Sequence, residues 1–182
     1  MKRMLTVPFF LYAVSIAAGG TTVSINETQW KINGDITYPG TPAEGLLMNV
    51  RMVNSTFEDR KRTDSDSDEN TARFISKIPE YHTCGVRAFT LNLQGGFPGY
   101  EGAANSAFRP NGTLRKSHMS RIKRVIEVCD KHNMIVILGL FYQRQDQILR
   151  DERAVRRGVV NAVNWVKENG LTNIVNSFSS HA

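Results

Sequence analysis

The segment 134–142, "MIVILGLFY", decides the fold of this chain. Its apolar residues run almost without a break, as in strands of a parallel sheet that is covered on both faces. Two upstream segments have a similar character, 44–54 ("EGLLMNVRMVN") and 86–96 ("VRAFTLNLQGG"). A fourth apolar segment, "LTNIV", begins at Leu171. The sequence therefore predicts four strands.

Amphipathic helices are predicted between these strands. The first covers about residues 71–83. The second has apolar residues at i, i+3, i+4 and i+7, from Ile122 to Cys129, the spacing of one buried helix face. The third covers about 151–169 and stops at Gly170, a residue type that often follows a helix end. The order of elements is thus β-α-β-α-β-α-β.

This alternation predicts an α/β fold with a parallel sheet, either an open doubly wound sheet or a closed barrel. A dinucleotide-binding sheet would carry GxGxxG after its first strand, whereas "VNSTFEDR" (53–60) contains no glycine. Eight units of this spacing would need roughly 300 residues, and the chain has 182. We therefore expect a TIM-type (β/α) barrel, truncated after about three and a half units.

Hydrogen-bonding residues follow each predicted strand at its carboxyl end, where barrel enzymes build their sites. Tyr142 could also offer a stacking face for a sugar ring, although the loop that follows it could equally be structural. Arg51 and Arg87 lie within predicted strands and could orient a carboxylate or form a structural ion pair. The candidate substrate-binding residues are Asn54, Asn92, Gln94, Tyr142, Gln145 and Asp146.

The first twenty residues have the layout of a secretory signal peptide. Lys2 and Arg3 precede an apolar stretch that is shorter than a membrane span, and small residues follow it. An uncleaved N-terminal anchor is the alternative. We expect residues 1–20 to be removed, leaving a secreted or periplasmic protein with no membrane association.

The remaining chain divides into three parts by its composition. Residues 21–43 form a lead-in segment, 44–176 the partial barrel, and 177–182 a serine-containing tail that does not look native. Cys84 and Cys129 are expected to be buried thiols rather than a disulfide.

Several other patterns could indicate ligands but have simpler explanations. The acidic run "DSDSDEN" (64–70) lacks the glycine and the final glutamate of a calcium loop, so we interpret it as solvated. The four histidines have no ligand spacing. The basic residues of the second helix have no interleaved aromatic residues, so an outer helix surface is favoured over nucleic-acid binding. They are Arg115, Lys116, Arg121, Lys123 and Arg124. We expect no metal, no cofactor and no nucleic-acid partner, and the net charge of +6 does not change this view.

Longer motifs resemble those of a known family. They are "WKINGDITYPG", "GLLMNVRMVNSTFED", "RAFTLNLQGGFPGYEG", "NSAFRPNGTLR" and "VILGLFYQRQDQILRDERAV". Together they resemble secreted bacterial proteins of the cellulase-like glycoside hydrolase group with (β/α)8 barrels, clan A, over the N-terminal half of such a barrel. The resemblance implies a barrel fold and, in the intact relatives, hydrolysis of O-glycosidic bonds in a carbohydrate substrate.

The chain departs from that family at the catalytic residues. In the family a glutamate that follows an asparagine at the end of strand four is the acid/base, and a glutamate on strand seven is the nucleophile. Strand four here reads "NIVNSFSSHA" and contains no Asn-Glu pair. Retaining hydrolysis needs two carboxyl groups about 5–5.5 Å apart. We therefore predict no catalytic residues and no hydrolysis by this chain.

A second hypothesis keeps a different function class open. The chain could be a non-catalytic carbohydrate-binding or structural secreted protein that closes its half barrel by dimerisation. Unpaired edges of the predicted sheet would favour such self-association. In either case binding of a carbohydrate by this chain alone is expected to be weak.

Overall fold

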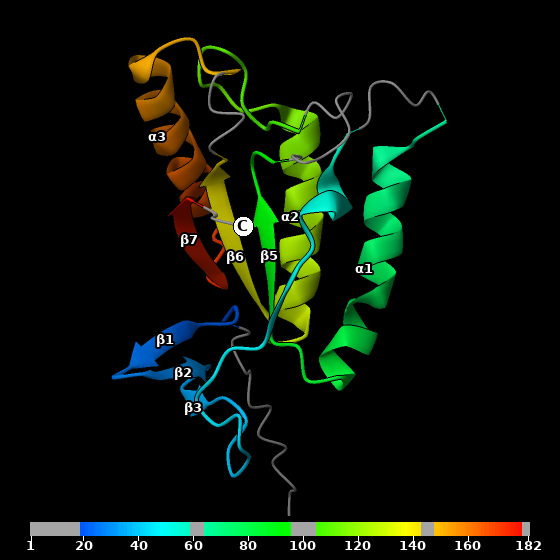
Figure 1. The fold of residues 1–182 in the computed structure, drawn as a ribbon, viewed down its shortest axis with the longest axis vertical. Helices are drawn as coiled ribbons and strands as arrows, with labels where there is room; N and C mark the ends of the chain where they lie inside the picture. The colour runs from blue at the N-terminus through cyan, green and yellow to red at the C-terminus, as the bar shows by residue number, and fades with distance from the viewer. Residues whose placement is uncertain (1–18, 59–63, 96–104, 143–147, 180–182) are drawn as a thin grey trace, which may run out of the picture.

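The computed structural model describes residues 19–58, 64–95, 105–142 and 148–179. Its main sheet has four parallel strands in the order β4-β5-β6-β7, which is also their order along the chain (Figure 1). The strands are β4 (Asn49–Arg51), β5 (Ala88–Asn92), β6 (Ile135–Phe141) and β7 (Ile174–Ser179). The helices between them are α1 (Ser67–Thr83), α2 (Lys116–Lys131) and α3 (Glu152–Glu168).

The strand order favours a barrel-like arrangement over a doubly wound one. Each crossover joins neighbouring strands, and right-handed crossovers of this kind place all three helices on one face of the sheet. A doubly wound sheet would instead reverse its strand order at a switch point, and the described strands contain no reversal. The structure confirms the predicted α/β fold with a parallel sheet, and this sheet fits part of an α/β barrel.

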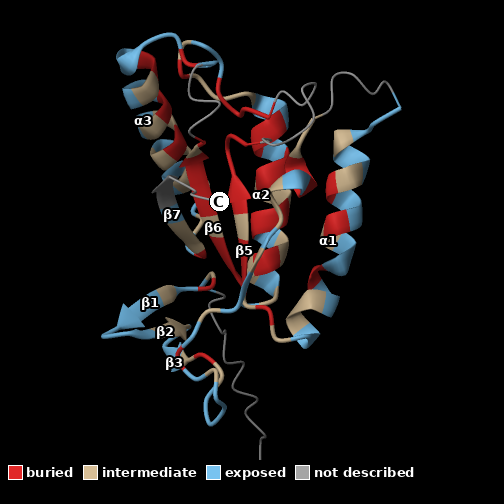
Figure 2. Ribbon diagram, viewed as in Figure 1, coloured by how far each residue is buried: buried red, intermediate tan, exposed pale blue. Residues whose placement is uncertain are grey.

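Alternation along β5 separates the core from the opposite face of the sheet. Phe89 and Leu91 are fully buried within the core that the helices cover. Phe89 makes edge-on ring contacts with Phe74 and Tyr81 of α1, at centroid distances of 5.1 and 5.4 Å. Successive residues of a strand point to opposite faces, so Thr90 and its alternate neighbours lie on the other face, here called the inner face. Figure 2 shows that β5 and β6 form the buried centre of the molecule.

The first predicted strand is shorter in the structure than in the sequence analysis. Only Asn49–Arg51 pairs as β4, and the 3-10 helix η1 (Val53–Thr56) follows it. Leu46 and Met48 were expected within this strand but are 59% and 47% exposed. The prediction was wrong there because apolar composition alone does not supply a pairing partner. The other predicted strands are confirmed, with bounds that differ by a few residues.

Helix α1 begins four residues before the expected start. Asp66 accepts hydrogen bonds from the backbone N–H groups of Asp68 and Glu69, at 2.8 and 3.0 Å. This side-chain cap satisfies two amide groups that otherwise have no partner at a helix start. The acidic run that we interpreted as solvated thus begins α1. Helices α2 and α3 lie where the periodicity placed them.

A small antiparallel sheet occupies the segment that we treated as a lead-in. It consists of β1 (Val23–Asn26), β2 (Gln29–Ile32) and β3 (Asp35–Ile36). Figure 1 shows it beneath the amino ends of the parallel strands. Its attachment there includes the Tyr38 hydroxyl, which donates to the Gly85 carbonyl at 2.8 Å, and the Asn33 amide, which donates to Asn133 Oδ1 at 2.9 Å.

The two cysteines are free and lie in different environments. Cys129 is buried as expected, and burial raises the pKa of its thiol to about 12. Cys84 is exposed at the end of α1, so the prediction of a second buried thiol was wrong. Residues 1–18, which include most of the predicted signal peptide, lie outside the described residues. Within the part of the chain that the structure describes, no helix is long and apolar enough to cross a membrane.

Candidate functional site

The candidate site lies at the carboxyl end of β5. Asn92 and Gln94 are on the inner face and are 1% and 0% exposed. The Gln94 amide bridges two other segments: its Nε2 donates to Ser106 Oγ at 3.2 Å, and its Oε1 accepts from the Tyr142 backbone N–H at 3.4 Å. The structure therefore brings the Gln94 side chain to the Tyr142 backbone, and Asn92 lies two residues before Gln94 at the end of β5. Gln94 fixes the end of β5 to the residue that follows β6.

The other predicted binding residues are placed differently. Asn54 is exposed on η1 and lines a pocket with α1 residues, including Asn70 and Phe74. Its backbone carbonyl accepts from Asn70 Nδ2 at 3.0 Å, which ties η1 to the first turn of α1. Gln145 and Asp146 lie outside the described residues.

An ion-pair cluster that the sequence did not suggest lies close to this site. Glu58, in the loop after η1, accepts from Arg121 Nη2 through Oε1 at 2.6 Å and from Arg115 Nη2 through Oε2 at 2.5 Å. The Arg121 side chain is 3% exposed and the Glu58 side chain 15%. Arg121 Nε also donates to the Thr56 carbonyl at 3.1 Å. We call Glu58, Arg115 and Arg121 the Glu58 clamp.

The Glu58 clamp corrects our interpretation of the basic residues in α2. Arg115 and Arg121 were assigned to an outer helix surface, but both point inward and hold the β4–α1 loop. Arg124 does lie at the surface, where it pairs with Asp68 at 3.1 Å. The sequence could not separate these cases, because Glu58 is 57 and 63 residues away from its two partners.

The charge of Glu58 is fixed by its partners. Burial by itself would raise the pKa of Glu58, but the hydrogen bonds from Arg115 and Arg121 outweigh it and lower the pKa. A carboxyl group with a low pKa remains ionised near neutral pH and is a poor proton donor. Glu58 therefore acts as a structural counterion and is unsuited to general acid catalysis.

His118 is buried beside the Glu58 clamp. Its side chain is fully buried, and neither ring nitrogen has a hydrogen-bond partner. Burial, followed by the nearby charge of Arg121, lowers the pKa of His118 to about 4, although Glu58 acts in the opposite direction. The ring is therefore neutral at ordinary pH.

Two more buried polar atoms without a hydrogen-bond partner belong to the same region. They are Thr56 Oγ1 and Asn105 Nδ2. Thr56 accepts from Arg121 through its carbonyl, and Asn105 Oδ1 accepts from the Glu58 backbone N–H at 3.1 Å. Buried polar atoms are usually paired. These atoms lie near the carboxyl ends of β4 and β5, so this region contains several buried polar atoms that have no hydrogen-bond partner.

The described residues do not form a metal site. Among them, no group of three or more histidine, cysteine, aspartate or glutamate side chains could hold a metal ion. His82 and His132 have ring centroids 6.1 Å apart, but no carboxylate or thiol completes a set of ligands there.

No family model matches this chain. No curated protein matches it either. Among solved structures, it is similar to endo-1,4-beta-mannanase from Eisenia fetida, with 14% identity and a TM-score of 0.48 over 85% of this chain and 43% of that one. It is also similar to the isomaltulose synthase SmuA from Protaminobacter rubrum, with 17% identity and a TM-score of 0.34 over 51% of this chain and 16% of that one. The chain thus spans less than half the length of either structure.

Proposed function

We propose that this chain forms about three and a half β/α units of a TIM-type glycoside hydrolase-like barrel, and that it contributes carbohydrate-binding groups without a catalytic pair. The observation that carries the proposal is the hydrogen bond from the Tyr142 backbone N–H to Gln94 Oε1, which joins the carboxyl ends of the neighbouring parallel strands β5 and β6 just beyond Asn92. Barrel enzymes bind their substrates at this end. The motifs of the sequence that resemble cellulase-like hydrolases support the same assignment.

Different roles follow for the residues of the proposed site. Gln94 is a positioning residue, because both ends of its amide are used within the protein. Asn92 and Tyr142 supply the amide and the aromatic ring that would contact a sugar, with Asn54, Gln145 and Asp146 as further contacts from the loops after β4 and β6. Asn54 would act at the outer rim of such a site, since it faces α1.

The proposal includes the absence of hydrolysis by this chain. Glu58 is the described carboxylate nearest to the site, and its ion pairs with two arginines keep it from acting as an acid. Positioned acid–base catalysis contributes about 10²–10⁴-fold to a rate, so its loss would bring turnover close to the buffer blank.

Two measurements on the 182-residue chain test this function. Aryl glycosides and soluble polysaccharides should show no turnover above the blank. Titration with soluble oligosaccharides, followed by NMR, should show weak binding that Asn92→Ala and Tyr142→Ala reduce. Tyr38→Phe, a change at the amino ends of the strands, is the control and should leave binding unchanged.

Each measurement has an outcome against the proposal. Turnover that disappears in Glu101→Gln or Asp146→Asn would overturn the assignment of an inactive chain. Binding that survives both Asn92→Ala and Tyr142→Ala would exclude the proposed site.

Export is part of the same proposal. The mass of the chain recovered outside the cytoplasm should show removal of about the first twenty residues.

A further inference from the structure

The parallel sheet has two edges, β4 and β7. Among the described residues, neither strand pairs with another strand on its outer side. Figure 1 shows β7 at one margin of the sheet, next to β6. An unpaired edge presents a row of backbone N–H and C=O groups to any strand that can approach it.

The hydrogen bonds between the β4 segment and β5 show which backbone groups of β4 point outward. The Met48 carbonyl accepts from Ala88 N at 3.2 Å, and Met52 N donates to the Thr90 carbonyl at 3.0 Å. Bonding directions alternate along a strand, so Asn49 and Arg51 direct their backbone groups away from β5.

The same alternation applies to β7. Val136 N donates to the Asn173 carbonyl at 2.8 Å. Asn173 therefore faces β6, and Ile174 and Asn176 direct their backbone groups outward. Each edge thus has identified N–H groups that a proline can remove without breaking the existing sheet.

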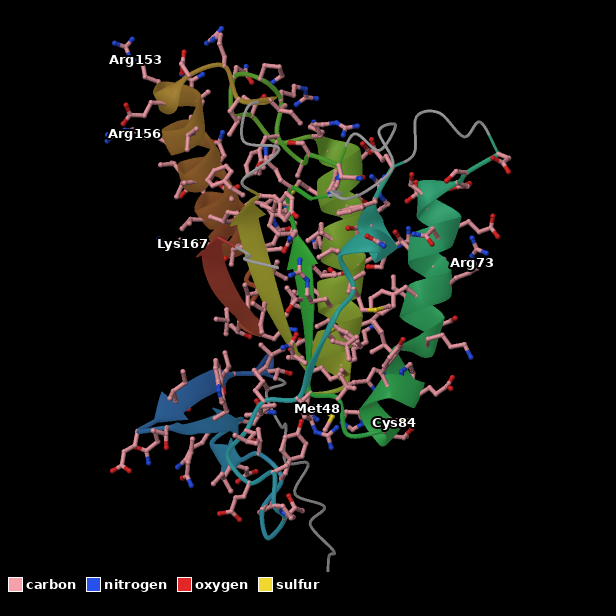
Figure 3. All side chains as sticks on the ribbon, in the orientation of Figure 1. Met48, Arg73, Cys84, Arg153, Arg156 and Lys167 are labelled. Carbon is pink, nitrogen blue, oxygen red and sulfur yellow. The ribbon has the colours of Figure 1, made fainter. Side chains whose placement is uncertain are left out.

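The β4 edge is three residues long and includes one charged side chain, Arg51. Exposed Leu46 and Met48 precede it, and Figure 3 labels Met48 on the segment that leads into β4. Two adjoining pockets lie along the neighbouring face of α1 and share Lys77 and Tyr81. Natural edges are more often guarded by lysine, proline or a bulge.

We propose that two copies of this chain close one eight-stranded barrel. A two-fold axis parallel to the strands would pair β4 of each copy with β7 of the other and keep all eight strands parallel. One symmetry operation then satisfies both edges, which a single unrelated partner strand would not do. Eight strands also give an interior that side chains can fill. This inference rests on the sheet edges and does not require the proposed function.

The main experiment blocks one edge at a time in the 182-residue chain. Arg51→Pro removes an outward N–H of β4, and Asn176→Pro removes one of β7. Arg51→Ala and Asn176→Ala are the matched controls, because they keep the N–H groups. Sedimentation over a range of concentrations should give a dimer for the unaltered chain and both alanine variants. Each proline variant should raise the dissociation constant at least tenfold, with helical circular dichroism retained.

Mixing the two proline variants provides the sharpest test. In a mixed dimer one seam carries both prolines, but the other seam joins an unaltered β4 to an unaltered β7. The mixture should therefore recover dimer that neither variant forms alone. If only one of the two prolines dissociates the dimer, the seam joins like edges and the proposal is wrong.

Other results would also overturn the closed barrel. A monomer at every concentration excludes association, and mass that keeps growing with concentration indicates an open chain of copies. If one proline variant loses its helical signal, the other proline variant and its matched alanine control decide the matter, because unchanged association in that proline variant contradicts edge pairing.

Discussion

At the amino ends of the parallel strands the charged side chains Arg87 and Asp130 contact backbone groups and the Tyr38 ring, whereas at the carboxyl ends a carboxylate lies between two arginines. Tyr38 and Asn33 add neutral hydrogen bonds at the first end. The second end has the Glu58 clamp and buried polar atoms without partners, including both ring nitrogens of His118. The comparison shows that the buried ion pairs and the buried polar atoms without hydrogen-bond partners named here gather at the carboxyl ends.

The largest expected effect comes from removing the shared carboxylate. Glu58→Ala leaves Arg115 and the buried Arg121 without their counterion, and loss of one partner of a buried pair costs about 3–5 kcal/mol. Because Glu58 is partly exposed, we expect a loss near the lower limit. Urea unfolding measures it, and added acetate should restore part of the loss by occupying the vacated site. A change below about 1 kcal/mol would show that the two ends of the strands do not differ as we describe.

Lowering the pH should reduce the free energy of unfolding through His118, which is buried near the carboxyl ends of the strands. Its pKa is about 4 in the folded chain against 6.5 when exposed. Below pH 6.5 the unfolded chain binds the extra proton, so the free energy of unfolding falls as the pH drops toward 4. The total loss is roughly 3 kcal/mol, at 1.36 kcal/mol per pH unit.

Urea unfolding between pH 7 and 5 isolates this effect. The lowered pKa of Glu58 acts in the same direction but at lower pH, because its stabilisation is lost only as the carboxylate is protonated. His118→Phe should remove most of the slope. The pKa of His82 is also lowered, first by burial, so His82→Gln is the control that should keep the His118 contribution. An unchanged slope in His118→Phe would exclude His118 as its source.

A smaller effect is expected at the amino ends. The Tyr38 hydroxyl donates to the Gly85 carbonyl at 2.8 Å and accepts from Met48 N at 3.2 Å. Tyr38→Phe removes both bonds and should cost about 1 kcal/mol, because water can reach these partly exposed groups. Thermal unfolding at pH 7 and pH 5 should show the same loss at both values. A loss that depends on pH would show that a group titrating between these values takes part in the Tyr38 contacts.

The sequence predicted the parts of the fold that follow from local patterns. The helix spacing from Ile122 to Cys129 and the apolar run at 134–142 identified α2 and β6, because burial of one or both faces leaves a periodic trace. The β1–β3 sheet was missed although Asn33-Gly34 is a strong hairpin signal. Both residues have positive φ, 54° and 89°, as a type I′ turn requires.

The candidate site was less predictable for a physical reason. Asn92, Gln94 and Tyr142 could be proposed because they directly follow predicted strands. The Glu58 clamp and the burial of His118 depend on contacts between distant segments, and no local pattern reports such contacts. Arg121 has the same sequence signal as Arg124, yet one lies in the core region and the other at the surface.

The smallest expected effect concerns the surface ion pair between Arg124 and Asp68. Arg124 Nη1 lies 3.1 Å from Asp68 Oδ1, and the two side chains are 39% and 68% exposed. This pair joins α1 to α2 at the same end of the strands as the Glu58 clamp, one helical turn from Arg121. Water and salt screen an exposed pair, so Arg124→Gln should change the free energy of unfolding by no more than about 0.5 kcal/mol. Urea unfolding at low and high salt measures it beside Glu58→Ala. Equal losses in the two variants would mean that charge itself, rather than its burial between segments, stabilises the carboxyl ends.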